Sequence, residues 1–156
     1  MDTIDSNYLG VVRDLTDRLE TTSIDWALTG STSHALQGIP ITPNDIDVQT
    51  SECGAFLIED RFSENVREPV SYVESEDIKS YLGELEVDGI SVEIIGDIQK
   101  RQNEGEWEPP VNVAAHRKFV HVHDLRVPVL TIEYEVKAYE QLGREERAAL
   151  LREHRD

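Results

Sequence analysis

Two aspartates separated by one apolar residue are the first feature of the sequence that suggests chemistry. They lie in the run Asn44-Asp45-Ile46-Asp47-Val48, which alternates polar and apolar residues as a half-buried strand does. Side chains two residues apart in a strand point to the same face, so Asp45 and Asp47 project together while Ile46 and Val48 face the core. The two carboxylates repel each other, and a divalent cation such as Mg²⁺ removes that repulsion. The alternative is a solvated strand edge in a very acidic chain.

A glycine–serine pair precedes these aspartates by about 15 residues. The segment 24–29 is apolar enough for a short buried strand, and it ends at Gly30-Ser31. Glycine at that point lets the backbone approach a ligand closely. Ser31 and Thr32 supply hydroxyls, and a helix expected over 32–37 offers free N–H groups to a phosphate. A plain turn with Ser or Thr as the N-cap is the alternative.

A third carboxylate, Glu93, lies in a strand expected over 90–95. This strand follows Asp88-Gly89, a two-residue hairpin signal that joins it to a strand expected over 81–87. Val92 and Ile94 alternate with Glu93, so the carboxylate faces away from their side. A bound cation would explain an acid inside an otherwise apolar strand, and an outward surface residue is the alternative.

The elements that must position these residues follow from apolar periodicity and breakers. We expect helices over 6–22, 32–37, 52–60, 132–142 and 144–155, strands over 24–29, 45–49, 81–87, 90–95, 119–122 and 126–130, and a loop over 99–112. This order predicts an α/β (α+β) fold, a mixed sheet flanked by helices with a C-terminal helical segment. A length of 156 residues favours a single domain, with the core at about 24–130 and the C-terminal helices at about 131–155.

The charge is the strongest compositional signal. The chain has 32 acidic and 15 basic residues, a net charge of −17, and its basic residues are 11 Arg and 4 Lys. This pattern is typical of halophilic proteins, whose acidic surfaces repel themselves less in strong salt. An ordinary acidic protein is the alternative. In either case we expect no non-specific binding to duplex DNA.

The chain carries no sign of a membrane or secretory destination. It has no apolar run near the roughly 20 residues of a membrane helix, and residues 1–5 lack the features of a signal peptide. Cys53 is its single cysteine, so no internal disulfide forms. A cytoplasmic protein is therefore expected.

Together, these motifs resemble the nucleotidyltransferase superfamily of DNA polymerase beta type. The segment 26–38 followed by 44–48 is most similar to the small branch that contains aminoglycoside and lincosamide nucleotidyltransferases, and the run 127–144 resembles that branch's closing helices. The resemblance covers roughly residues 24–150. It implies transfer of a nucleoside monophosphate from a nucleoside triphosphate, ATP before others, to a hydroxyl acceptor that the sequence does not identify.

The resemblance also implies roles for individual residues. Asp45, Asp47 and Glu93 would bind Mg²⁺, or Mn²⁺ in its place, and act in catalysis, while the phosphates would contact the set Gly30, Ser31, Thr32 and Lys137. The third acid of the pattern is usually Asp, and Glu stands there in this chain. An inactive nucleotide-binding subunit, for instance in a toxin–antitoxin-like pair, is therefore the alternative. A second copy or a partner protein is a candidate to complete the cleft.

The remaining histidines and Trp107 carry weaker signals. His121 and His123 share one strand face near His116, but a zinc site needs three or four ligands, so a solvated strand is favoured. His34 lies in the expected phosphate-side helix and would contact nucleotide or pack in the core. Trp107 would stack on a base or cover the edge of the core.

Overall fold

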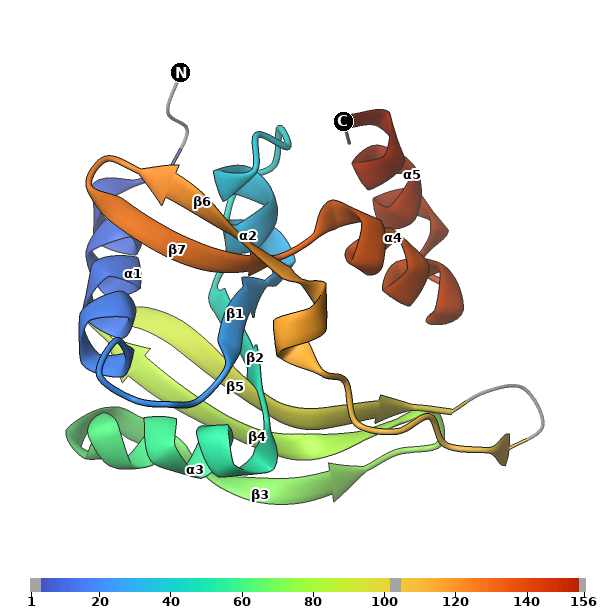
Figure 1. The fold of residues 1–156 in the computed structure, drawn as a ribbon, viewed down its shortest axis with the longest axis horizontal. Helices are drawn as coiled ribbons and strands as arrows, with labels where there is room; N and C mark the ends of the chain where they lie inside the picture. Colours follow the sequence, from blue (N-terminus) through green and yellow to red (C-terminus); the bar gives the residue numbers. More distant parts are fainter. Residues whose placement is uncertain (1–3, 102–104, 155–156) are drawn as a thin grey trace.

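The computed structural model describes residues 4–101 and 105–154. Within them, seven strands form one sheet in the order β3-β4-β5-β2-β1-β7-β6 (Figure 1). The elements are α1 (Ser6–Leu19), β1 (Trp26–Thr29), α2 (Gly30–Leu36), β2 (Ile46–Thr50), α3 (Glu52–Arg61), β3 (Val66–Glu74), β4 (Ile78–Val87), β5 (Ile90–Lys100), β6 (Arg117–Val122), β7 (Leu125–Leu130), α4 (Ile132–Gln141) and α5 (Glu145–His154), with 3-10 turns at Ser63–Asn65 and Val113–His116.

The sheet is mixed, as predicted. Strand β2 pairs parallel with β5 and antiparallel with β1, and β1 pairs parallel with β7. The outer pairs β3–β4, β4–β5 and β6–β7 are antiparallel. The predicted hairpin at Asp88-Gly89 is present, and both residues have positive φ, 52° and 79°. At the centre of the sheet, β2 thus lies between β1 and β5.

One face of the sheet is closed by α1 and α3. Both helices contribute buried apolar residues to the main core, including Leu15 of α1 and Ile58 of α3, and Ile46, Val48 and Val92 of the sheet pack in the same cluster. These positions are fully buried. Because side chains alternate along a strand, the residues between them project to the opposite face.

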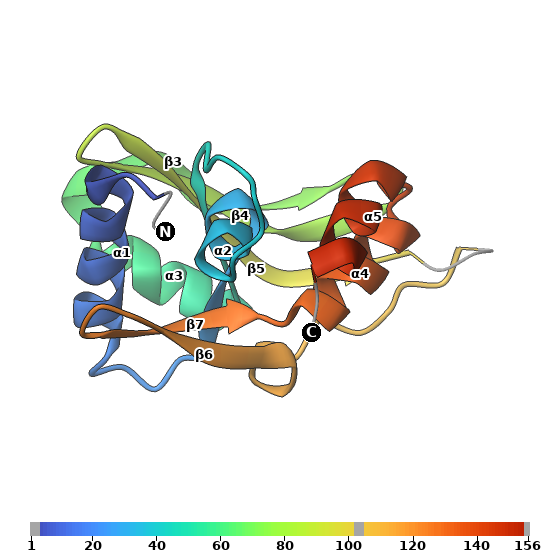
Figure 2. The same ribbon diagram turned by 90° about the horizontal axis from the view of Figure 1, so that it is seen from above.

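The C-terminal helices lie at the other end of the molecule from α1 and α3, with α2 between (Figure 2). Helix α4 packs against α5 and against the segment after α2, and this smaller core contains Ile39, Ile132, Val136 and Leu151. The predicted C-terminal helical segment is thus confirmed, and it stands against the face of the sheet that α1 and α3 leave open. Among the described residues, no helix is both long enough and apolar enough to cross a membrane.

Two stretches differ from the sequence-based expectation. Strand β3 was not expected, because it is an edge strand whose residues are mostly exposed and include Pro69, so its apolar pattern is weak. Strand β5 continues to Lys100 and does not stop at 95. The expected loop over 99–112 is therefore shorter at its start, and Arg101 forms an isolated bridge with Trp107.

Candidate active site

The three carboxylates singled out by the sequence lie together on the open face of the sheet. Asp47 of β2 and Glu93 of β5 are direct partners in the parallel ladder, and Asp47 also stands opposite Thr29 of β1. Asp45 immediately precedes β2, two residues before Asp47 on the same side. Parallel pairing of β2 and β5 thus joins acids that are 46 residues apart in the chain.

The environment of Asp47 disfavours its negative charge. Its Oδ1 atom is buried and has no hydrogen-bond partner. Burial, followed by the neighbouring charges of Asp45, Glu93 and Glu135, raises the pKa of Asp47 to about 7. The pKa of Glu93 is also raised, first by loss of water around it and then by Asp45 and Glu84. The site therefore holds carboxylates that lack a positive counterpart.

Gly30 brings the start of α2 against Asp47. Its φ is 75°, and a Cβ atom at this position would lie 2.3 Å from Oδ2 of Asp47, so only glycine fits without displacing the carboxylate. The hydroxyls of Ser31 and Thr32 hold the loop that leads into β2. The Ser31 Oγ accepts from the amide of Asn44 at 3.0 Å, and the Thr32 hydroxyl donates to the carbonyl of Asp45 at 2.6 Å.

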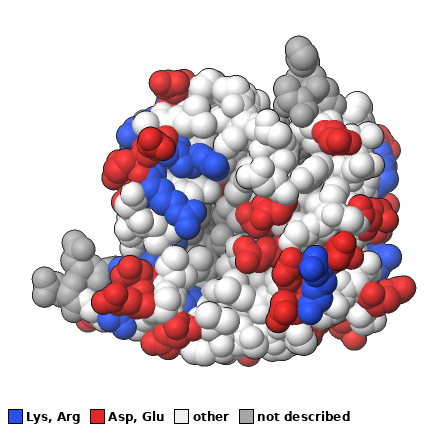
Figure 3. Space-filling view, turned by 180° about the vertical axis from the view of Figure 1, so that it is seen from behind, with Lys and Arg blue, Asp and Glu red and all other residues white. Residues whose placement is uncertain are grey.

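A cleft of about 390 Å³, lined by Asp47 and Glu93, lies between the sheet and α4. Its polar lining includes Thr29, Gln49, Ser80, Lys100, Glu135 and Arg144, and its apolar walls include Leu82, Ile95, Ile98, Tyr139 and Leu142. The face of the molecule opposite the view of Figure 1 is visibly hollowed, with acidic side chains near the hollow and basic ones across it (Figure 3).

A buried polar chain supports the floor of the cleft. Glu135 of α4 is 2% exposed, and its carboxylate accepts a hydrogen bond from the Thr29 hydroxyl and pairs with Nε2 of His34. Arg147 of α5 approaches the other ring nitrogen, Nδ1, at 3.2 Å. His34 is thus a buried supporting residue that links α2 to both C-terminal helices.

The structure does not bring every predicted residue to the cleft. Lys137 is exposed on α4 and is not part of the lining, so the cations available there are Lys100 and Arg144. Trp107 lies outside the cleft lining, with Lys79 and Arg101 over its ring at 4.6 and 4.5 Å.

The histidines in and around β6 do not form a metal site. His121 and His123 are exposed, and His116 stacks on Tyr134 at 4.6 Å. Sequence reasoning missed Gln49, Lys100 and Glu135 as cleft residues. Gln49 could have been predicted from the sequence, because it continues the alternation of Asp45 and Asp47.

The carboxylates have the donor chemistry for a divalent cation. No group of three or more Asp, Glu, His or Cys side chains among residues 4–101 and 105–154 stands close enough together to hold a metal as the side chains lie. The unpartnered Oδ1 of Asp47, its neighbours Asp45 and Glu93, and the raised pKa values nevertheless fit a hard cation with oxygen ligands.

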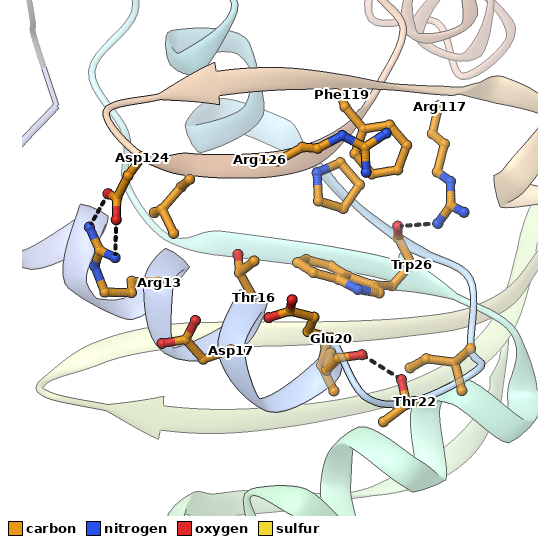
Figure 4. A pocket seen from close by; sticks show the side chains of 14 residues that line it. Arg13, Thr16, Asp17, Glu20, Thr22, Trp26, Arg117, Phe119, Asp124 and Arg126 are labelled. Carbon is orange, nitrogen blue, oxygen red and sulfur yellow. Dashed lines mark hydrogen bonds and ion pairs between the residues drawn. The ribbon is translucent and has the colours of Figure 1, made fainter.

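A second pocket, of about 410 Å³, lies between α1 and the β6–β7 hairpin (Figure 4). Its arginines are engaged by neighbouring groups: Arg13 pairs with Asp124 at 2.8 Å, and Arg117 donates to the carbonyl of Trp26 at 3.0 Å. The guanidinium of Arg126 lies 3.7 Å from the centre of the Phe119 ring. Asp17 and Glu20 of α1 also line this pocket, which is separate from the carboxylate site on the sheet.

Comparison with known proteins shows the family and the fold. The sequence model of a family described as aminoglycoside-2″-adenylyltransferase matches residues 11–156. A Thermotoga maritima protein provisionally assigned as a nucleotidyltransferase is 49% identical, with a TM-score of 0.87 over 96% of this chain and 93% of that one. Among curated proteins, none matches the chain significantly.

Two more distant structures share the fold. The lincosamide antibiotic adenylyltransferase LnuA, solved with lincomycin, has 14% identity and a TM-score of 0.58 over 96% of this chain and 98% of that one. An antigenic nucleotidyltransferase-like protein from Paracoccidioides brasiliensis has 15% identity and a TM-score of 0.51, over 95% and 76% of the two chains. At these identities the likeness concerns the fold alone.

Proposed function

This chain belongs to the aminoglycoside-2″-adenylyltransferase family, and from that premise we propose that it transfers a nucleotidyl group from a nucleoside triphosphate, ATP first among the candidates, to a hydroxyl acceptor. The observation that carries the proposal is the buried, unpartnered Oδ1 of Asp47 beside Asp45 and Glu93. Keeping three neighbouring carboxylates ionised costs free energy, because they repel one another, and a bound cation removes that cost.

Asp45, Asp47 and Glu93 are the residues that would hold Mg²⁺ or Mn²⁺. When bound there, a divalent cation supplies charge stabilisation at the transferring phosphate and activates the attacking hydroxyl. The burial that raises the pKa of Asp47 also keeps water from its Oδ1 atom, and in such a setting electrostatic contacts are stronger.

The other residues of the site have roles that follow from their positions. Gly30 leaves room for a phosphate chain to approach the backbone next to Asp47. Arg144 lines the same cleft and offers a planar guanidinium to phosphate oxygens. Glu93, whose pKa is raised, is suited to accept the proton of the acceptor hydroxyl. Ser31 and Thr32 position Asp45 and stay predicted phosphate contacts. Lys137 does not, because it is exposed on α4 outside the cleft lining.

The experiment has two stages that separate turnover from binding. The first measures thermal stabilisation by ATP with Mg²⁺ in wild type and in Asp45→Asn and Asp47→Asn. The second measures pyrophosphate release across a panel of hydroxyl-bearing acceptors. We expect stabilisation and release in wild type only. Stabilisation without release from any acceptor would favour the inactive nucleotide-binding subunit, and no stabilisation would remove the nucleotide site.

A further inference from the structure

A lysine ammonium group is buried in the cleft at a distance from the carboxylates. Lys100 is 5% exposed, and its Nζ lies 3.2 Å from the Tyr134 hydroxyl and 5.5 Å from the centre of that ring. In the part of the chain that the structure describes, no carboxylate forms an ion pair with it. A buried charge without a counter-ion is costly, so this position favours an anion from outside the chain.

A β-bulge in β5 is what turns Lys100 into the cleft. Glu93 and Ile95 line the cleft from odd-numbered positions, whereas Ile98 and Lys100 line it from even-numbered ones. Between them, the β4–β5 register shifts and Asp97 adopts a φ of 48°. One extra residue inverts the side-chain alternation of a strand. Without the bulge, the cleft would receive Asp97 and Gln99 and would have no lysine.

An unpartnered donor, the side-chain amide of Gln49, lies between Lys100 and the acids. Gln49 is 5% exposed, and its Nε2 atom is buried without a hydrogen-bond partner. It lies two residues beyond Asp47 on the same face of β2 and lines the cleft. Buried polar groups in native proteins are almost always paired. The amide of Gln49 and the ammonium of Lys100 therefore point to a ligand that supplies acceptor oxygens along this part of the cleft.

The position of Lys100 assigns this ligand to the acceptor. Lys100 lies seven positions after Glu93 in β5, roughly 20 Å of strand at about 3.3 Å per residue. A triphosphate with its α-phosphate at Asp47 is too short to span that length. The other lining cation, Arg144, lies near Tyr139, which contacts His34 of α2, so it belongs to the α2 side of the cleft.

We propose that Lys100 and Gln49 form an acceptor subsite for a carboxylate or phosphate group, so that the acceptor is an anionic molecule that bears a hydroxyl. This inference rests on the proposed nucleotidyl transfer. In that reaction the cleft must hold an acceptor as well as the nucleotide, and the Lys100 subsite is assigned to that acceptor. It places the acceptor in a different charge class from the cationic aminoglycosides.

The test uses the lysines themselves as reporters. The chain has four lysines, Lys79, Lys100, Lys118 and Lys137, so ¹³C labelling at Cε gives a spectrum that single variants assign. Glycerol 3-phosphate and glycerate are titrated at constant ionic strength, with glycerol as the uncharged match. We expect both anions, but not glycerol, to shift the Lys100 signal and leave that of exposed Lys137 unchanged. Lys100→Met should weaken anion binding at least tenfold, and Lys137→Met should not.

Each other outcome overturns the inference in a distinct way. If neither anion shifts the wild-type Lys100 signal, the anion subsite does not exist. If the anions bind but ATP with Mg²⁺ displaces them, Lys100 serves the nucleotide and the acceptor assignment is wrong. None of these titrations needs turnover, and the titrations with anions alone need no nucleotide. If the proposed transferase activity is not found, the Lys100 titration can therefore still be interpreted. If the Lys100 titration fails, the test of transferase activity is likewise unaffected.

Discussion

At the scale of single residues, Asp47 makes the stability of the metal-free chain depend on pH. Its pKa is about 7 in the folded chain against an ordinary 3.8, so the folded state binds the proton more tightly than the unfolded state. The stabilisation from this proton is fully present below about pH 4 and is lost as the pH rises through 7. Asp47→Asn, which keeps a neutral side chain, should be more stable than wild type at pH 8 by roughly 1–3 kcal/mol.

Urea unfolding of both proteins at pH 4.5 and pH 8 without divalent cations measures this difference. We expect the gap in unfolding free energy to be small at pH 4.5 and large at pH 8, where added Mg²⁺ should stabilise wild type and leave Asp47→Asn unchanged. The exposed Asp60→Asn on α3 is the control. A gap that does not change with pH would refute the raised pKa.

Gly30 gives a second prediction at this scale, with Gly38 as its matched control. Both residues have positive φ, 75° and 89°, but a Cβ at Gly38 meets no atom within 4 Å. Each Gly→Ala change should cost about 1 kcal/mol of stability for the backbone conformation. Only Gly30→Ala also displaces the Asp47 carboxylate, so it alone should weaken ATP binding with Mg²⁺ by tenfold or more in calorimetry. Equal weakening in the two variants would contradict a specific role for Gly30.

At the scale of elements, the position of α4 depends on its buried acid. Glu135 joins α4 to β1 through Thr29 and to α2 through His34. Glu135→Ala leaves these partners buried and unpaired, which should cost about 3 kcal/mol and lower the Tm by roughly 6–12 °C. Thermal unfolding measures the change, and Glu133→Ala, at an exposed position of the same helix, is the control. Matching Tm values for the two variants would show that the buried chain does not hold the helix.

The sequence predicted those elements whose signals are local. The Asp45–Asp47 alternation and the Asp88-Gly89 hairpin required only neighbouring residues, and both are seen in the structure. Strand β3 depends on pairing with β4 and shows no apolar stripe of its own. Glu135 carried a usable signal, because it shares a helix face with Ile132 and Tyr139 and so places an acid on an apolar face.

Lys100 could not have been found from its sequence alone. A strand that keeps regular alternation from Glu93 would turn Asp97 and Gln99 to the cleft, and it is the bulge beside Gly96 that changes this. Gly96 lies against α3, where a Cβ would be 2.8 Å from the carbonyl oxygen of Ser51. The bulge is thus associated with a tertiary contact between β5 and the start of α3, which no periodicity in the sequence reveals.

At the scale of the whole molecule, 32 acids against 15 bases leave a net charge of −17 on 156 residues. Like charges on a folded surface are closer together than in the unfolded chain, so their repulsion opposes folding. Salt weakens that repulsion, because the Debye length falls from about 10 Å at 0.1 M to about 3 Å at 1 M. Ion pairs with arginine offset only part of this repulsion, because exposed pairs such as Arg13–Asp124 contribute little to stability.

The stability of the chain should therefore rise with salt over the range in which screening changes. We expect the urea midpoint at pH 7.5 to increase steadily between 0.05 and 1 M KCl and to level off above that, because the Debye length is by then shorter than the spacing of most surface charges. Sucrose at matched osmolality is the control for general exclusion effects, which act without screening. A midpoint that is flat or falls across this range would mean that the acidic surface does not limit stability, and the adaptation to strong salt suggested by its composition would be wrong.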